Sequence, residues 1–277
     1  MTKTVGRMTK TLFEMTKKDR NDSFIQRIKI FCLILFCICF TYSNSFGQTV
    51  GVSINDTWLV QNGQVFGAKP DENGPIGGGA GYQKIVTQGD YHVKDLDGLL
   101  AALKSAKEGE VIFIDGHAEI DCTDLVFTEK FQIQIPAGVT LASDRGHKGS
   151  EGAIIRSDNF ATMPLIKAIG PNIRISGLRI IGPDPKPRLE HHRRSFNSQR
   201  GDRKAQDQYY YLLPNSRGIS TDFGFLEVDN CELSGWSHAA IFLQDGRNNH
   251  IHHNYIHHNQ RNGLGYGVCL GRGKIVS

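Results

Sequence analysis

Hydrophobic and polar positions alternate over short stretches of this chain and recur at regular distances in its second half. Three segments can be written over one another, with apolar residues five positions apart around a small or amide residue, namely 175–182, 228–235 and 251–258. The last two copies are 23 residues apart (228 to 251). A short alternating strand precedes each copy, at 164–169, 218–222 and 240–244, and another begins at 268–270. These runs are too short and too regularly alternating for helices, so they predict strands.

A repeat of about 20–25 residues with several strands per repeat is typical of a solenoid, in which each turn packs on its neighbours. The alternation predicts one inward-facing column, made by Ile219 and Thr221, Ile241 and Leu243, and Val268 and Leu270. Asparagine tolerates the left-handed backbone that tight corners need. The asparagines at 248, 249, 254, 259 and 262 are therefore expected at turns. The prediction is an all-β parallel solenoid.

The first half of the pattern predicts a helix that covers the start of this solenoid. Leucines recur at helical spacing over 95–106, and Asp95 or Asp97 can cap the first turn. Such a helix would protect the open sheet edge of the first coil. Strands are expected over 85–87, 110–116, 125–127, 131–135 and 139–141, and around Ile120. At 271–277 the pattern stops inside a coil, which predicts that C-terminal coils are missing.

The N-terminal part predicts export rather than fold. An apolar run over 30–40 follows Arg27 and Lys29, and small residues follow it. This order is typical of a secretory signal peptide. The run is shorter than the roughly 20 residues of a membrane-spanning helix. We expect cleavage between Gly47 and Gln48, a periplasmic or extracellular location, and no stable membrane insertion afterwards.

The predicted organisation is a leader over 1–47, an irregular segment over 48–83 and the solenoid over 84–277. The leader holds eight of the 32 Lys and Arg and three of the 28 Asp and Glu, so the rest has 24 basic and 25 acidic residues. This balance removes the main support for nucleic-acid binding. Three cysteines, at 122, 231 and 269, remain after the leader and allow one disulfide at most. Cys231 and Cys269 fall in strands, which favours burial as small apolar residues.

A basic insertion over 183–217 interrupts the repeat with eight Lys and Arg and four Asp and Glu. Long loops on a rigid scaffold often carry function, although a solvated loop is an open alternative. Arg binds carboxylates with two hydrogen bonds, and a Tyr ring can stack on a sugar. A uronate lyase needs a cation beside the sugar carboxylate and a base for the α-proton. We therefore name His191, Arg193, Arg194 and His238 as candidate catalytic residues, and Arg188, Tyr209 and Tyr210 as candidates for substrate binding.

Two further clusters raise the question of a metal. Asp222, Asp229 and Asp245 fall near corresponding places on neighbouring coils, and oxygen clusters bind Ca²⁺, although Asp also caps turns. In a strand, His250 and His252 share one face. A transition-metal site needs ligands from several elements. We therefore interpret the histidines over 250–258 as a solvent-facing polar ladder.

With these features in place, residues 84–277 resemble the pectate-lyase-like superfamily. The resemblance is carried by the helix and first strand over 86–116, by NIRISGLRI (172–180) and by FLEVDNCELS (225–234). It implies a right-handed parallel β-helix and work on an acidic polysaccharide. Asn230 and Leu226 replace the His and Trp of the superfamily's motif, and no downstream Arg motif follows.

Three functions stay open at this point. The first is a lyase that cleaves a uronate-containing polysaccharide by β-elimination. The second is a non-catalytic module that binds glycan or serves as a surface or adhesive element. The third is a glycoside hydrolase, for which Asp222 and Asp245 are the only carboxylate pair we name.

Overall fold

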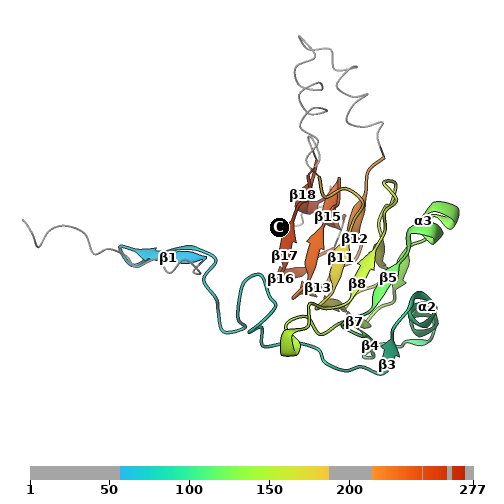
Figure 1. The fold of residues 1–277 in the computed structure, drawn as a ribbon, viewed down its shortest axis with the longest axis horizontal. Helices are drawn as coiled ribbons and strands as arrows, with labels where there is room; N and C mark the ends of the chain where they lie inside the picture. The colour runs from blue at the N-terminus through green and yellow to red at the C-terminus, as the bar shows by residue number, and fades with distance from the viewer. Residues whose placement is uncertain (1–56, 187–213, 245, 261–263, 272–277) are drawn as a thin grey trace, which may run out of the picture. The chain divides into compact units, whose positions relative to one another are not determined.

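The computed structural model describes residues 57–186, 214–244, 246–260 and 264–271. The chain divides into two compact units, Met1–Val60 and Gln61–Ser277. A two-stranded sheet of β1 (Trp58–Gln61) and β2 (Gln64–Gly67) comes first. Within the described residues, the helical elements are α2 (Leu96–Ser105), α3 (Thr123–Glu129) and the short 3-10 helix η1 (His147–Gly149). The remaining elements are strands, so the all-β class is confirmed (Figure 1).

Three parallel sheets contain all the other strands. The first sheet consists of β3 (Tyr91–Val93), β4 (Val111–Ile114), β7 (Thr140–Ala142), β10 (Ile173–Ser176), β13 (Leu226–Asp229) and β16 (His250–His252). The second consists of β5 (Glu119–Asp121), β8 (Ile154–Arg156), β11 (Arg179–Ile181), β14 (Glu232–Ser234) and β17 (Tyr255–His257). The third consists of β6 (Ile133–Ile135), β9 (Ile166–Ala168), β12 (Arg217–Thr221), β15 (Ala239–Leu243) and β18 (Tyr266–Leu270).

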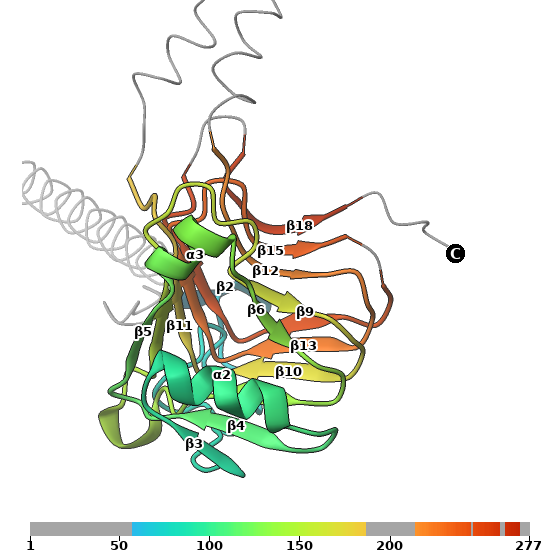
Figure 2. The ribbon, with the colours of Figure 1, turned by 90° about the vertical axis from the view of Figure 1, so that its right-hand side faces the viewer.

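From β4 onward the chain visits the three sheets in rotation. It passes through β4, β5 and β6, then β7, β8 and β9, and repeats this order to β16, β17 and β18. Each strand therefore pairs in parallel with the strand one turn earlier and one turn later, as the ladders in Figure 2 show. The two copies that the sequence placed 23 residues apart are paired turns, with Val228 opposite Ile251.

The register stacks like residues into apolar columns between the sheets. One column runs through Ile133, Ile166, Ile219 and Ile241, which are all fully buried. A second runs through Ile112, Leu141, Ile175 and Val228, and a third through Ile120, Ile155, Ile180 and Leu233. Each buried aliphatic side chain stabilises the fold by about 1.5–3 kcal/mol. The predicted inward column is confirmed at Ile219, Thr221, Ile241 and Leu243.

The last strand departs from that prediction. Val268 and Leu270 have the expected register with Ile241 and Leu243, but their exposed fractions are 42% and 76%. Their pairing is therefore correct and their burial is not. No strand of the described part of the chain lies beyond β18 to cover them.

Asparagines hold the corners between the sheets, as predicted. Asn254 accepts a hydrogen bond from Cys231 N and donates one to Val228 O, at 2.9 and 2.7 Å. Asn259 accepts from Trp236 N at 2.9 Å in the same way, one corner further along. An amide side chain suits this position because it carries both a donor and an acceptor for the preceding turn. The left-handed backbone expected of these residues is found at Asn248, with φ +58°, but not at Asn249, Asn254 or Asn259. At the last two corners it is the preceding residue, His253 or His258, that is left-handed, and Asn262 lies outside the described residues.

The helix predicted over 95–106 is confirmed as α2. Asp95 caps it by accepting a hydrogen bond from Gly98 N at 2.8 Å. Its apolar face buries Leu99 and Ala102 and contacts β3 and β4 at the start of the first sheet (Figure 2). The helix thus packs at the end of the stack at which the prediction placed it.

Two predicted strands are wrong. Residues 85–87 have no regular structure, and the strand that pairs with β4 is Tyr91–Val93. Residues 125–127 lie inside helix α3, where Val126 is buried and Phe127 is 77% exposed. A three-residue apolar run shows no period, so it cannot distinguish a strand from a helical turn.

Cys122 and Cys231 are buried, Cys269 is half-buried, and all three are free thiols. The burial predicted for Cys231 is confirmed. Burial raises the pKa of the Cys122 and Cys231 thiols to about 12, so both stay protonated and act as apolar core residues.

Candidate metal centre

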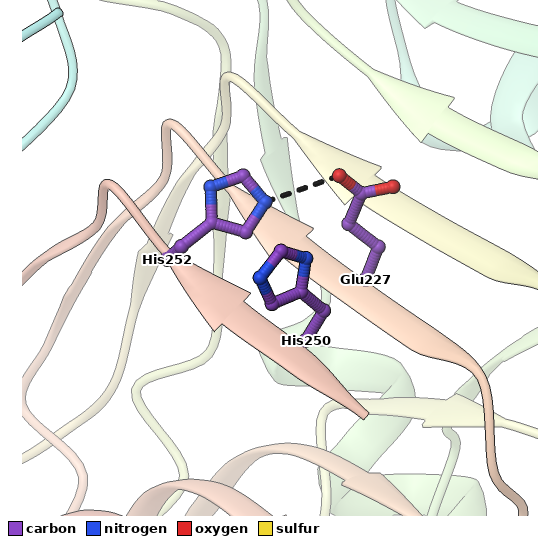
Figure 3. Close-up of side chains that lie close together, drawn as sticks. All are labelled: Glu227, His250 and His252. Atoms are coloured by element: carbon purple, nitrogen blue, oxygen red, sulfur yellow. Dashed lines mark hydrogen bonds and ion pairs between the residues drawn. The ribbon is translucent and has the colours of Figure 1, made fainter. Parts of the chain in front are cut away.

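Two neighbouring strands of the first sheet bring together one carboxylate and two imidazoles. The register of β13 and β16 places Glu227 opposite His250 and Asp229 opposite His252. Ile251 packs against the core, so His250 and His252 lie on the outer face of the sheet, where Glu227 also lies (Figure 3). One ligand atom from each of Glu227, His250 and His252 can be chosen such that all lie within 4.8 Å of one another.

This donor set suits a divalent transition metal. Imidazole nitrogen is a preferred ligand for Zn²⁺, Ni²⁺, Cu²⁺ and iron, and one carboxylate with two His ligands leaves coordination positions open. Ca²⁺ instead prefers six to eight oxygen ligands. The interpretation of the histidines as a polar ladder missed this convergence, because it considered β16 without Glu227 on the neighbouring strand.

A chain of hydrogen bonds runs outward from the metal-capable residues. His252 Nε2 lies 3.1 Å from Glu227 Oε1, and His252 Nδ1 lies 2.8 Å from His253 Nδ1. His253 Nε2 lies 3.0 Å from Asp71 Oδ1. A hydrogen bond from the Asn73 backbone and a further one from His253 lower the pKa of the Asp71 carboxyl, which therefore remains an anionic acceptor.

The number of protons along this chain is compatible with a metal ion at its Glu227 end. Three hydrogen bonds with a carboxylate at each end need three N–H protons, whereas two neutral imidazoles carry only two. A metal ion bound at His252 Nε2 would take the place of the third proton. With a metal there, His252 donates from Nδ1 to His253, and His253 donates from Nε2 to Asp71, so every remaining contact is satisfied.

A buried ion pair lies beside the centre on the same face of the sheet. Asp229 is fully buried and accepts from Arg174 Nε at 2.9 Å and from Arg174 Nη2 at 2.7 Å. Tyr82 Oη and Ser176 Oγ donate to the same carboxylate at 2.8 and 3.0 Å. Burial and the Asp229 hydrogen bond raise the pKa of Tyr82, and the Asp229 hydrogen bond raises that of Arg174. Arg174 Nε also lies 3.9 Å from Glu227 Oε2, which is an ion pair without a hydrogen bond.

The predicted Ca²⁺ ligands are not assembled among the described residues. Asp229 has four donors on its carboxylate, and Asp222 pairs with Lys167 at 3.2 Å in another sheet. Asp245 lies outside the described residues. Both described carboxylates face a protein cation in this arrangement, and Ca²⁺ binding by these residues stays a prediction.

His238 directly precedes β15 of the third sheet, whereas the centre lies on strands of the first sheet. Its Nδ1 accepts from Arg217 Nε at 2.8 Å, and Arg217 packs over the Phe242 ring. Burial, with the charge of Arg217, lowers the pKa of His238 to about 4. A general base works best with a pKa near the working pH, so this environment argues against the predicted base role of His238.

The other predicted site residues all fall in the basic insertion. His191, Arg193, Arg194, Arg188, Tyr209 and Tyr210 lie outside the described residues and remain predictions.

Three residues of the centre were missed at the sequence level. Glu227 could have been predicted, because the 23-residue repeat that aligns Val228 with Ile251 also aligns Glu227 with His250. His253 was only part of the general histidine cluster. Asp71 has no sequence feature that connects it to His253, which is 182 residues away.

The chain matches no protein-family model, no curated protein and no solved structure. The fold and the site together describe an all-β protein with three parallel sheets and a candidate metal centre on an outer face. Among the described residues, no helix has the length and apolar character to span a membrane.

Proposed function

We propose that this chain is an exported right-handed parallel β-helix of the pectate-lyase-like kind that acts on an acidic polysaccharide. The rotation of the chain through three parallel sheets supports the solenoid, and the charged and apolar order of residues 27–47 supports export. The expected location is therefore periplasmic or extracellular.

The observation that carries the proposal is the convergence of Glu227, His250 and His252 on an outer sheet face. His250 is exposed, so a polymer that reaches this face can contact a cation held there. A divalent cation held there supplies positive charge that neutralises a uronate carboxylate and makes the neighbouring α-proton more acidic. The role of His250, which is exposed, and of His252 and Glu227 is to hold that cation.

The proposed reaction is β-elimination. A base takes the proton α to the uronate carboxylate, the electron pair forms a carbon–carbon double bond, and the bond to the leaving sugar oxygen breaks. That oxygen then takes up a proton. We assign the base to the insertion, at His191 or its neighbour His192, and a second carboxylate contact to Arg193 and Arg194.

A non-catalytic glycan-binding module is the second candidate. It is favoured by a specific observation: the described residues provide a cation site, whereas the environments of His238 and Tyr82 do not suit a base. His238 has a low pKa, and Tyr82 donates to Asp229 with a raised pKa. The same metal centre would then hold a uronate carboxylate without turnover.

The test uses the full mature chain with a panel of uronate polymers, loaded with Zn²⁺, Ni²⁺ or Mn²⁺ or stripped with EDTA. The unsaturated uronate formed by elimination absorbs in the ultraviolet, so its appearance is followed directly. A lyase gives a rise that His250→Ala abolishes and that His257→Ala, an imidazole on the second sheet, leaves in place. No rise, with metal-dependent retention on a polymer column, assigns the module. If the absorbance does not rise and the chain is not retained on the column, the polysaccharide proposal is rejected.

A further inference from the structure

One coil of the stack carries the same His-His-Asn corner twice. His252 and His253 form the first corner, and His257 and His258 form the second, each with facing Nδ1 atoms, at 2.8 and 2.6 Å. In each corner the first His lies 3.1 Å from a glutamate of the preceding turn, Glu227 or Glu232. The two corners therefore serve as internal controls for one another.

The corners differ in two respects. His250 completes the metal-capable set at the first corner, whereas the register gives its place at the second to Tyr255. His253 Nε2 has Asp71 at 3.0 Å, while among the described residues no such carboxylate faces His258. The corner that can bind a metal is thus the one in which the second imidazole, that of His253, contacts the carboxylate of Asp71.

Asp71 arrives there on a segment, residues 71–82, that is packed against the same corner; we call it the docking segment. Gly79 N donates to Asn230 Oδ1 at 2.7 Å, and the Tyr82 ring lies 5.2 Å from that of His253. At Gly78, where φ is +66°, a Cβ would lie 2.5 Å from Asn230 Oδ1 and from His253 O. Only glycine permits this approach of the two backbones.

We infer that His253 and Asp71 are positioning residues of the metal centre, and that metal binding and attachment of the docking segment strengthen each other. A metal at His252 Nε2 fixes the proton on Nδ1, which then needs His253 Nδ1 as acceptor. That tautomer of His253 has its proton on Nε2, which needs Asp71. Outer hydrogen bonds of this kind set the orientation and basicity of a metal-bound imidazole. Linkage is reciprocal. The free energy by which Asp71 strengthens metal binding is therefore also the free energy by which bound metal stabilises the attachment of the docking segment.

This inference rests on the metal centre of the proposed function, but not on any action on polysaccharide. The experiment is a calorimetric titration of the full mature chain with Zn²⁺ alone and Ni²⁺ alone. Asp71→Ala should weaken the affinity about 10- to 100-fold, the range known for outer-shell partners. The control is Glu72→Ala, which removes the same charge from the neighbouring exposed position. It should leave affinity near that of the wild type.

The reciprocal readout is hydrogen exchange of the docking segment. Metal should slow exchange at the amides of residues 77–82 in the wild type and in Glu72→Ala, and should have a smaller effect in Asp71→Ala. Equal affinities for Asp71→Ala and Glu72→Ala, or exchange that metal does not change, would overturn the coupling while leaving the centre intact. A wild-type chain that binds neither metal would overturn the centre itself and this inference with it.

Discussion

Replacement of Asp229 by Asn tests whether the buried carboxylate is a structural anchor. Asp229 is fully buried and accepts two hydrogen bonds from Arg174 and one each from Tyr82 and Ser176. Asp229→Asn removes the charge and turns one acceptor into a donor that faces other donors. Loss of one member of a buried ion pair costs about 3–5 kcal/mol. Because the Arg174 side chain is 25% exposed and can regain some water, we expect the lower end, about 3 kcal/mol.

The matched control for this change is Asp222→Asn. Asp222 pairs with Lys167, and the two side chains are 45% and 35% exposed. Exposed pairs of this kind contribute about 0–1 kcal/mol. The free energy of unfolding of both variants is measured by urea denaturation, with Ca²⁺ and with EDTA. Equal losses in the two variants would refute the anchor. A loss at Asp229 that appears only with Ca²⁺ would restore its predicted role as a Ca²⁺ ligand.

Two further predictions concern the removal of one histidine and the introduction of another. The pKa of His238 is lowered from its ordinary value of 6.5 to about 4, so the unfolded chain takes up this proton first and stability falls as the pH drops from 6.5 towards 4. In His238→Gln this part of the pH dependence should disappear, while the exposed His117→Gln should keep it; identical pH profiles of wild type and His238→Gln would contradict the assignment. Tyr255→His should complete a second metal centre with Glu232 and His257, because their register repeats that of Glu227 and His252. The calorimetric stoichiometry should then rise from one metal to two per chain, and an unchanged value would count against the ligand geometry.

Much of the fold could be predicted from the sequence because its information is local and repeated. Alternation gave the strands of the later turns, and the 23-residue spacing gave the register that stacks Val228 on Ile251. Helix α2 followed from leucine spacing and from Asp95. The helix at 125–127 was missed because Val126 alone faces the core, so the run carries no period.

Less of the site could be predicted, because residues that are far apart in the sequence come together in it. Glu227 and His250 are joined by the repeat, yet the strand pairing had to be applied to polar positions as well as to apolar ones. Asp229 was predicted only as a Ca²⁺ ligand, and its partners Tyr82 and Arg174 come from distant segments without a shared pattern. Burial and the neighbouring Arg217 decide the pKa of His238, and neither can be read from the residues beside it in the sequence.

The docking segment has a consequence for how the stack opens. Together with Lys84, it reaches four successive turns of the first sheet. Gly77 O accepts from Arg145, Lys84 O accepts from Arg174, Tyr82 donates to Asp229, and Asp71 faces His253. A solenoid held only by neighbouring turns can fray from its end one turn at a time. Here the turn that contains β16 cannot detach without also releasing contacts made early in the chain. Fraying of that turn is therefore a cooperative event. During folding, the turn is complete only when contacts between residues more than 140 positions apart have formed.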